Sequence, residues 1–271
     1  MVEASADGAP VDPPVDASVA AARRAIRLID LTDLDDHSTA DAVESLCGRA
    51  REHGTAAVCV WPDFVRVTAQ ALADSSVRVA TVVNFPAGTD RPFAVGVLTE
   101  RALADGADEI DVVLPYLAWL GGDTARAAAV LDAVRRTCGT GGATMKVILE
   151  TGELPDTDAV ARAARFAVEH GADFVKTSTG KTERSATPEA VGAMLAVISS
   201  TDRAVGIKPS GGIRTAADAA RYLDLADAVM GDGWASPSTF RFGASGLLDA
   251  LLAVVVGDAP TSPGDGYRDG Y

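Results

Sequence analysis

Three stretches of the chain follow one pattern, in which a glycine precedes a short and mostly apolar run: Gly54-Thr-Ala-Ala-Val-Cys59, Gly106-Ala-Asp-Glu-Ile-Asp111 and Gly171-Ala-Asp-Phe-Val-Lys176. A glycine suits the left-handed position that ends a helix, and the run that follows is typical of a buried strand. Each stretch therefore predicts a junction from a helix to a strand. The last residue of each stretch stands five positions after its glycine, so we expect these side chains to point inward at similar heights.

The rest of the chain alternates between short β-branched runs and longer alanine-rich helical stretches. Several of the short runs are apolar throughout, which is typical of parallel strands covered on both faces. Helices are predicted over Asp156–His170 and Thr187–Ser200, the second with Thr187 as its N-cap and Pro188 as its first residue. Thr215 and Asp218 have the spacing of a capping box. The predicted strands are Ile26–Thr32, Thr55–Trp61, Val77–Asn84, Glu109–Pro115, Thr144–Glu150, Asp173–Thr177, Ala204–Lys208 and Asp227–Met230.

Eight strands that alternate with helices predict an α/β fold of the (β/α)8 TIM-barrel type. An open, doubly wound parallel sheet is the alternative. A chain of 271 residues suits one such barrel. We expect a single catalytic domain over 18–257, with flexible tails over 1–17 and 258–271 because both ends are poor in apolar residues.

The composition limits the partners and the location of the protein. Asp and Glu number 38 against 24 Lys and Arg, a net charge of −14. Such a surface repels nucleic acid and anionic lipid, so we expect neither as a partner. The chain has no apolar run long enough for a membrane span and no signal-peptide pattern. Its three cysteines are too widely spaced for a disulfide framework or a zinc site. We therefore expect a cytoplasmic protein without a bound metal.

Lysine is rare in this chain and gathers at predicted strand ends. Only four of the 24 basic residues are lysines: Lys146, Lys176, Lys181 and Lys208. An amine can lose its proton and act as a nucleophile, whereas a guanidinium stays charged. Lys176 and Lys208 end consecutive predicted strands, where barrel enzymes carry their active sites. Two adjacent ammonium groups repel, which lowers the pKa of one amine and makes it a nucleophile. The alternative is a structural ion pair with Asp111 or Glu150.

Asp111 interrupts the apolar run Glu109–Pro115, and it has two compatible interpretations. It can be the counterion of a buried lysine, or it can move protons beside an imine. Cys59, which occupies the equivalent position in its own stretch, is more simply explained as a buried strand cysteine than as a nucleophile.

Glycine-rich loops are expected after three consecutive strands: Gly180-Lys181, Gly211-Gly212 and Gly243-Ala-Ser-Gly246. Loops of this kind lead into helix N-termini, whose backbone N–H groups bind phosphate in many barrels. Lys181 could add a cation. The sequence therefore predicts a local phosphate site in an otherwise acidic protein.

These residues resemble those of the deoxyribose-phosphate aldolase family, class I aldolases built on a (β/α)8 barrel. The similarity runs in order over about residues 26–256, and the Lys-Thr-Ser-Thr-Gly and Lys-Pro-Ser-Gly-Gly elements are its most specific parts. The matching segments are Asp30-Leu-Thr-Asp-Leu34, Val83-Asn-Phe-Pro-Ala-Gly88, Gly106–Pro115, Lys146–Glu153, Gly171–Lys181, Lys208–Arg214 and Arg241-Phe-Gly-Ala-Ser245.

The resemblance implies the reversible cleavage of 2-deoxy-D-ribose 5-phosphate to D-glyceraldehyde 3-phosphate and acetaldehyde, without a metal or an organic cofactor. By matching position, Lys176 forms the Schiff base, Lys208 lowers its pKa and assists proton transfer, and Asp111 moves protons. Lys146 helps to hold the charge network of the site. The resemblance further implies a sugar pocket of Asp30, Thr32 and Cys59, and phosphate contacts from Gly180, Lys181, Gly211, Gly212, Gly243 and Ser245.

The chain differs from this family pattern at one loop and is open to two interpretations at its end. Many relatives have two serines where this chain has Ser245 and Gly246, so one hydroxyl contact to phosphate is missing and a backbone N–H at Gly246 would replace it. Tyr271 ends the chain, as in members whose terminal tyrosine reaches the site, but it could equally be an incidental residue of a flexible tail. Relatives are often dimers, so a homodimer is expected.

Two other functions fit parts of the pattern. A phosphosugar isomerase or synthase would need acid and base carboxylates but no pair of lysines. A barrel that only binds its ligand would need the phosphate loops alone. The presence of Lys176, Lys208 and Asp111 together favours the aldolase over both.

Overall fold

The structure, a computed structural model, describes residues 15–257. Residues 1–14 and 258–271 lie outside this range, so most of the two expected tails, and Tyr271 with them, lie outside the described residues. The first helix, α1 (Val15–Ile26), begins within the range expected as the N-terminal tail.

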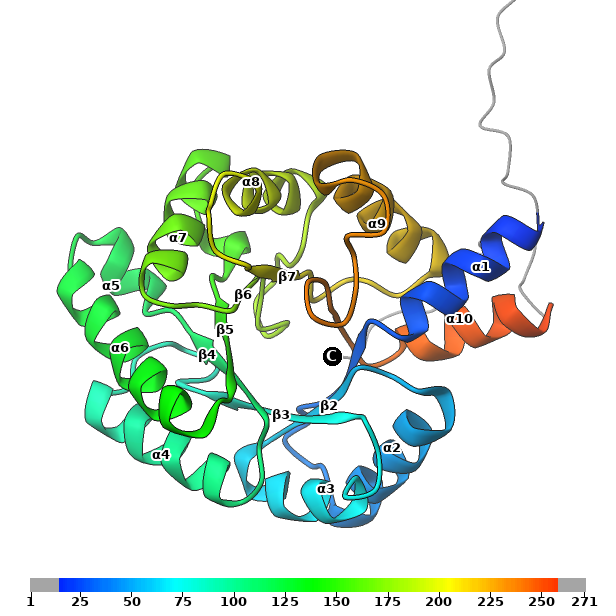
Figure 1. Ribbon diagram of the computed structural model, residues 1–271. Coiled ribbons are helices and arrows are strands. Elements are labelled where there is room, and N and C mark those ends of the chain that lie inside the picture. The colour runs from blue at the N-terminus through cyan, green and yellow to red at the C-terminus, as the bar shows by residue number, and fades with distance from the viewer. Residues whose placement is uncertain (1–14, 258–271) are drawn as a thin grey trace, which may run out of the picture.

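Eight parallel strands form one sheet in the order β7-β6-β5-β4-β3-β2-β1-β8. Bridges between Ile207 and Phe240 and between Ser210 and Gly243 join its two edges. The sheet is thereby closed, which confirms the (β/α)8 barrel and excludes the open sheet (Figure 1). The strands are β1 (Ile29–Asp33), β2 (Ala57–Val60), β3 (Arg78–Val83), β4 (Glu109–Val113), β5 (Thr144–Ile148), β6 (Phe174–Lys176), β7 (Gly206–Lys208) and β8 (Phe242–Ala244).

The prediction of the eighth strand was wrong. Asp227–Met230 forms the last turn of helix α9 (Ala216–Met230), and β8 lies further along the chain. The buried residues Ala219, Leu223 and Ala226 recur at helical spacing, so the apolar residues at 228–230 continue a helix. The true strand has three residues with Gly243 at its centre, and glycine weakens the sequence signal of a strand.

The helix ends agree with their predicted caps. The Thr187 side chain accepts a hydrogen bond from the backbone N–H of Ala190, and Pro188 begins α8 (Pro188–Ser199). Thr215 and Asp218 form the predicted capping box. The glycines of the three junctions have positive φ, 65° at Gly54, 108° at Gly106 and 86° at Gly171, as helix-ending glycines require.

Helices surround the barrel, and the first and last of them lie side by side (Figure 1). Helix α1 packs against α10 and α9. The remaining helices are α2 (Ala40–His53), η1 (Pro62–Phe64), α3 (Val65–Ala71), α4 (Pro92–Ala104), α5 (Tyr116–Leu120), α6 (Thr124–Gly141), η2 (Thr151–Glu153), α7 (Thr157–Glu169) and α10 (Leu247–Val256).

The interior of the barrel has two unlike halves. Strands β2 and β3 contribute small apolar side chains, which form a cluster separate from the main core. The main core lies between the strands and the surrounding helices and contains most of the buried apolar residues. Strands β1, β4, β5, β6 and β7 contribute buried charged side chains: Asp30, Glu109, Asp111, Lys146, Lys176 and Lys208.

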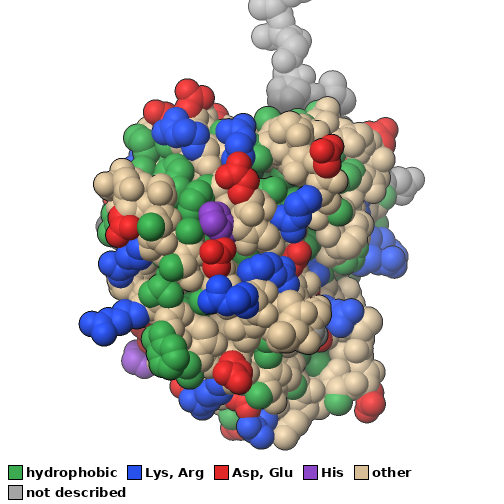
Figure 2. Space-filling model, turned by 60° about the vertical axis from the view of Figure 1, so that its left-hand side comes forward, with side chains coloured by type: hydrophobic (Ala, Val, Ile, Leu, Met, Phe, Trp, Pro, Cys, Tyr) green, Lys and Arg blue, Asp and Glu red, His purple; other side chains and the backbone are tan. Residues whose placement is uncertain are grey.

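On the face that Figure 2 shows, Lys and Arg side chains are interspersed with Asp and Glu side chains. Within residues 15–257, no helix has both the length and the apolar character that a bilayer crossing needs.

The packing of β7 predicts that one methyl group added at Gly206 lowers the stability of the protein. In a Gly206→Ala variant the new Cβ would lie 2.3 Å from Cε1 of the buried Phe174 ring. Overpacking of this kind destabilises a protein by about 1–3 kcal/mol, so urea unfolding should show a loss of that size. Gly192→Ala is the matched control, because its Cβ would meet nothing within 4 Å. It should stabilise α8 by about 0.5–1 kcal/mol. Equal stability of the two variants would contradict this packing.

Candidate active site

Six charged side chains inside the barrel form a closed ring in which carboxylates and cations alternate. We call it the charge ring. It holds three carboxylates and three cations, so its net charge is zero when all are ionised. The N···O distances around it are 2.8 Å for Asp111–Lys146, 2.5 Å for Lys146–Glu109, 2.8 Å for Glu109–Arg241, 2.6 Å for Arg241–Asp30, 2.5 Å for Asp30–Lys208 and 2.8 Å for Lys208–Asp111.

Lys176 is attached to the charge ring from outside. Its Nζ lies 2.8 Å from Oδ2 of Asp111, the oxygen that also accepts from Lys208 at 2.8 Å. The residue is only 3% exposed. Burial lowers the pKa of the Lys176 amine, and the charge of Lys208 lowers it further, against the opposing effect of Asp111. A proton on Lys176 would add a positive charge to a ring that is already balanced, so this amine is the one best able to be neutral.

The strand register brings these groups together. Asp111 is paired with Lys146 across β4 and β5, and Lys176 is paired with Lys208 across β6 and β7. Lys176 and Lys208 are the last residues of their strands, at the carboxyl end of the barrel where barrel enzymes carry their sites. Asp111 and Lys176 stand at the same distance in sequence from the glycine before each strand, which predicts that both point inward at similar heights. The structure confirms this prediction, since the two side chains are in contact.

Asp111 and Lys208, the two ring members nearest to Lys176 along the ring, keep their charges. Burial alone would raise the pKa of Asp111, but Lys146, Lys176 and Lys208 together hold it well below its usual range. Burial alone would lower the pKa of Lys208, but Asp111 and Asp30 raise it. Lys208 is therefore a fixed cation beside Lys176.

Two residues expected in a sugar pocket lie on neighbouring strands. Thr32 on β1 is paired with Cys59 on β2, and the Thr32 hydroxyl donates to the backbone carbonyl of Asp30 at 2.8 Å. Cys59 is fully buried, and burial raises the pKa of its thiol. A protonated thiol is a poor nucleophile, so the environment favours the interpretation of Cys59 as a buried strand cysteine.

The expected phosphate loops meet at the same end of the barrel. Gly180, Gly211 and Gly212 have φ values of 79°, 80° and 77°. A Cβ on Gly211 would lie 3.6 Å from the Cα of Gly180, so the loops after β6 and β7 touch. Ser245 is exposed directly after β8 and precedes Gly246, the N-cap of α10.

Two members of the expected phosphate site have other contacts in the structure. Gly243 lies within β8, and a Cβ there would be 3.0 Å from Cε of Lys208, so this glycine makes room for the charge ring. The Lys181 ammonium donates to the backbone carbonyl of Leu34 at 2.9 Å and lies 6.0 Å from the centre of the Trp61 ring. It therefore links the loop after β6 to the loop after β1.

Reasoning from the sequence missed two members of the charge ring, Glu109 and Arg241. Glu109 stands two positions before Asp111 on β4 and so points to the same face of the strand. The spacing of two residues could therefore have predicted that Glu109, like Asp111, faces the interior of the barrel. Arg241 precedes β8, whose position was predicted wrongly. Nothing in the strand pattern therefore indicated that the Arg241 side chain points into the barrel.

Glu150 has a structural role that the sequence did not specify. It is buried with a φ of 54°, and its carboxylate accepts from the Thr179 backbone N–H at 3.2 Å and from the Thr179 hydroxyl at 2.5 Å. It also accepts from the Thr182 hydroxyl at 3.3 Å. Glu150 therefore holds the loop that carries Gly180, while Asp111 is the carboxylate that Lys176 contacts.

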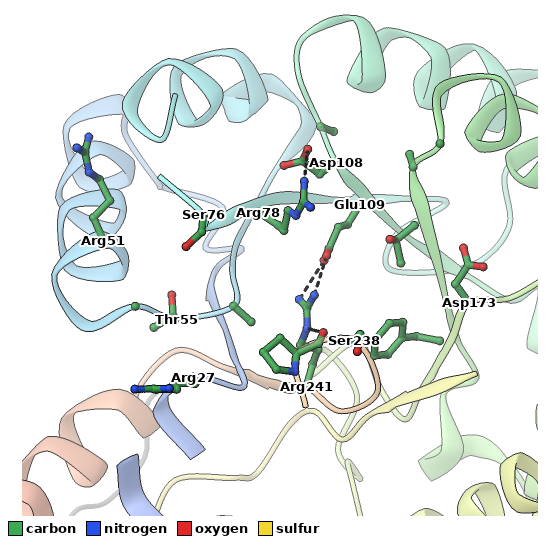
Figure 3. A pocket seen from close by; sticks show the side chains of 18 of the residues that line it. Arg27, Arg51, Thr55, Ser76, Arg78, Asp108, Glu109, Asp173, Ser238 and Arg241 are labelled. Atoms are coloured by element: carbon green, nitrogen blue, oxygen red, sulfur yellow. Dashed lines mark hydrogen bonds and ion pairs between the residues drawn. The ribbon is translucent and has the colours of Figure 1, made fainter. Parts of the chain in front are cut away.

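A cavity of about 1200 Å³ opens at the opposite, amino-terminal end of the barrel. Glu109 and Arg241 lie in its wall and point toward one another (Figure 3). Within the described part of the chain, no group of three or more His, Cys, Asp or Glu side chains could hold a metal ion.

A (β/α)8 barrel with buried charged groups at its strand ends is the architecture of a barrel enzyme. The sequence model of the DeoC/LacD family of aldolases matches residues 24–252. The deoxyribose-phosphate aldolase of Agrobacterium fabrum is 48% identical over 250 residues, which are 91% of this chain and 96% of that protein.

Two solved structures have the same fold along most of their length. A Coccidioides immitis chain assigned as a deoxyribose-phosphate aldolase has a TM-score of 0.76 and 31% identity, with 85% of each chain covered. A Toxoplasma gondii ME49 chain with the same assignment has a TM-score of 0.81 and 27% identity, with 90% of this chain and 97% of that chain covered. The chain belongs to the DeoC/LacD family of aldolases and is an enzyme.

The charge ring predicts a large loss of stability when its shared carboxylate is removed. In an Asp111→Asn variant the Lys146 and Lys208 ammonium groups lose one buried partner, and breaking a buried ion pair in this way costs about 3–5 kcal/mol. Urea unfolding at pH 7 should show this loss. Asp249→Asn is the control, because Asp249 is exposed and its pair with Arg49 lies on the surface. It should cost less than about 1 kcal/mol.

The same variant predicts how stability depends on pH. Because the folded state depresses the pKa of Asp111, its carboxylate stabilises the protein above its unfolded pKa of about 4. This stabilisation is lost as the pH falls through the folded pKa. The gap in unfolding free energy between the wild type and Asp111→Asn should therefore be constant near neutral pH and narrow below about pH 4. A gap that widens in acid would contradict the assignment.

Proposed function

We propose that this protein cleaves 2-deoxy-D-ribose 5-phosphate reversibly to D-glyceraldehyde 3-phosphate and acetaldehyde, with Lys176 forming the Schiff base. The observation that carries the proposal is the place of the Lys176 amine. It is buried, it lies 2.8 Å from Asp111, and it is the one cation that the balanced charge ring does not need. The Agrobacterium fabrum relative is named for this activity, and its 48% identity to this chain supports the same reaction here.

The neutral Lys176 amine attacks C1 of the sugar aldehyde and forms a carbinolamine, which loses water to become a protonated imine. The C3 hydroxyl then gives up its proton, and the C2–C3 bond breaks as its electrons move into the imine. D-Glyceraldehyde 3-phosphate leaves, and an enamine remains on Lys176. A proton added at C2 regenerates an imine, and water releases acetaldehyde and the free amine.

Asp111 is the group proposed to move these protons, directly or through a water molecule. Its Oδ2 is within hydrogen-bond distance of both Lys176 and Lys208. Lys208 keeps its own proton, so it repels the proton of Lys176 and stabilises the negative charge of Asp111. Lys146 holds the other oxygen of Asp111 at 2.8 Å and fixes the orientation of the carboxylate.

We propose that the substrate phosphate lies against the loops after β6, β7 and β8. Positive φ at Gly211 and Gly212 supports a cradle of backbone N–H groups there, and α10 begins directly after Ser245 and Gly246. Lys181 would reach this phosphate only by leaving the Leu34 carbonyl. Asp30, Thr32 and Cys59 are proposed to line the sugar pocket, and a contribution of Tyr271 stays a prediction.

We propose a cytoplasmic location and a homodimer for this enzyme, in the catabolism of deoxyribose phosphate. The three cysteines support the location, because all are buried and unpaired, and burial raises the pKa of Cys47 and Cys138 to about 11. The small-molecule substrate supports the absence of nucleic-acid and membrane partners. The homodimer rests on the resemblance alone.

Borohydride trapping tests the Schiff base directly. The protein is incubated with acetaldehyde or with the deoxyribose phosphate, reduced, and mapped by peptide mass spectrometry. We expect a single reduced adduct on Lys176 because its amine alone has a depressed pKa among the buried lysines. Unmodified Lys176 under conditions that trap a known imine enzyme would contradict the proposal.

The Lys176→Arg variant should lose turnover, because arginine keeps the charge but cannot form an imine. It should still bind the phosphosugar, as measured by calorimetry. Arg49→Lys is the matched control, since it exchanges one cation for another in a surface ion pair and leaves the amine of Lys176 in place. It should keep turnover and the trapped adduct.

Gly246→Ser tests the phosphate loop. Gly246 has an ordinary φ of −97°, and a Cβ there would meet nothing within 4 Å, so serine fits without strain. Its hydroxyl should add one hydrogen bond to phosphate and lower KM about three- to tenfold with kcat unchanged. With 2-deoxyribose that lacks the phosphate, KM should not change. The same gain with both sugars would show that Gly246 does not face the phosphate.

A further inference from the structure

Glu109 and Arg241 belong to the charge ring but have no part in the proposed reaction. They contact each other at 2.8 Å at the amino-terminal side of the ring, where they line the cavity of Figure 3. They are 3% and 5% exposed. Each also contacts one group that reaches the site: Glu109 contacts Lys146 at 2.5 Å, and Arg241 contacts Asp30 at 2.6 Å.

The charge ring connects the Glu109–Arg241 ion pair to Lys176 by two routes. Glu109 acts through Lys146 on Asp111, and Arg241 acts through Asp30 and Lys208 on the same carboxylate. Burial keeps water away from these contacts, so a charge added or removed anywhere in the ring is weakly screened. The loss of one member changes the balance that Lys176 experiences.

We propose that Glu109 and Arg241 are positioning residues that set, through the charge balance of the ring, the pH range in which the Lys176 amine reacts. The proposal rests on the proposed function, in which that amine is the nucleophile. Under this proposal, removing Glu109 and removing Arg241, the two partners of one ion pair, shift that pH range in opposite directions. A pair that served only to hold the barrel closed would give both partners the same effect.

The charged and titratable groups around Lys176 come from every strand of the charged half of the barrel and from β2. The charge ring supplies Asp30, Asp111, Lys146 and Lys208, β2 supplies Cys59, and Glu150 follows β5. Changes at Glu109 and Arg241 leave all of these groups in place, so a changed profile would report the balance of the ring.

The experiment measures the fraction of Lys176 trapped by acetaldehyde and borohydride at each pH, in folded protein checked by circular dichroism. Glu109→Gln removes a carboxylate, so Lys176 should lose its proton more readily and the acid limb should move down by about one pH unit. Arg241→Gln removes a cation, so the acid limb should move up by about the same amount. Shifts in the same direction, or no shift in either variant, would overturn the proposal.

Two controls separate charge from structure. The Glu109→Gln/Arg241→Gln double variant loses the ion pair but restores the balance, so its acid limb should return close to that of the wild type. A structural pair would instead leave the double variant at least as impaired as either single variant. Arg78→Gln removes a cation that lines the same cavity but pairs with Asp108 outside the charge ring, and its profile should not move.

The proposal stays testable if a single variant does not fold. The other single variant should still move the acid limb in its stated direction, and the double variant should still return it close to that of the wild type. A wild-type protein that traps no aldehyde on Lys176 contradicts the proposed function. A wild-type protein that traps it, with variants whose acid limbs do not move in these opposite directions, contradicts only the role of Glu109 and Arg241.

Discussion

A charge buried in a barrel must find an opposite charge, because an isolated ion in a dry interior is too costly to keep. Four buried cations share the interior with three carboxylates here, and six of these seven groups satisfy each other in a closed ring. Much of the local structure serves this arrangement. A Cβ at Gly243 would crowd both Ser210 and Lys208, and Glu109 and Asp111 use alternate positions of one strand to reach two levels of the ring.

The seventh group, Lys176, is the proposed nucleophile. In the proposed reaction Lys176 needs no contact beyond Asp111 to favour its neutral form, because the balanced charge ring leaves its proton without full compensation. This arrangement assigns the stability of the charged interior and the reactivity of one amine to different residues. The ring stabilises the folded interior with ionised groups, and the same ring disfavours ionisation of the adjacent amine. The small apolar side chains of β2 and β3 complete the division, since they fill the other half of the barrel without adding charge.

The local spacing of residues in the sequence predicts much of this structure. The glycines before Cys59, Asp111 and Lys176 predict strand phase because a left-handed helix end fixes where the next strand begins. The eighth strand was missed because three residues around a glycine have little strand propensity, whereas the helix before it continues an apolar repeat. The ring itself was not predictable, since its closure through Arg241 depends on which strands become neighbours when the sheet closes.

The contact between Asp30 and Arg241 joins residues that are 211 positions apart in the chain. The ring therefore cannot close until nearly the whole barrel has been synthesised, and contacts of such long range form slowly. A partly folded barrel would hold unpaired charges in its interior, which favours an open and hydrated state over a collapsed one. Closure of the charge ring and packing of α1 against α10 therefore both require residues from the two ends of the described chain.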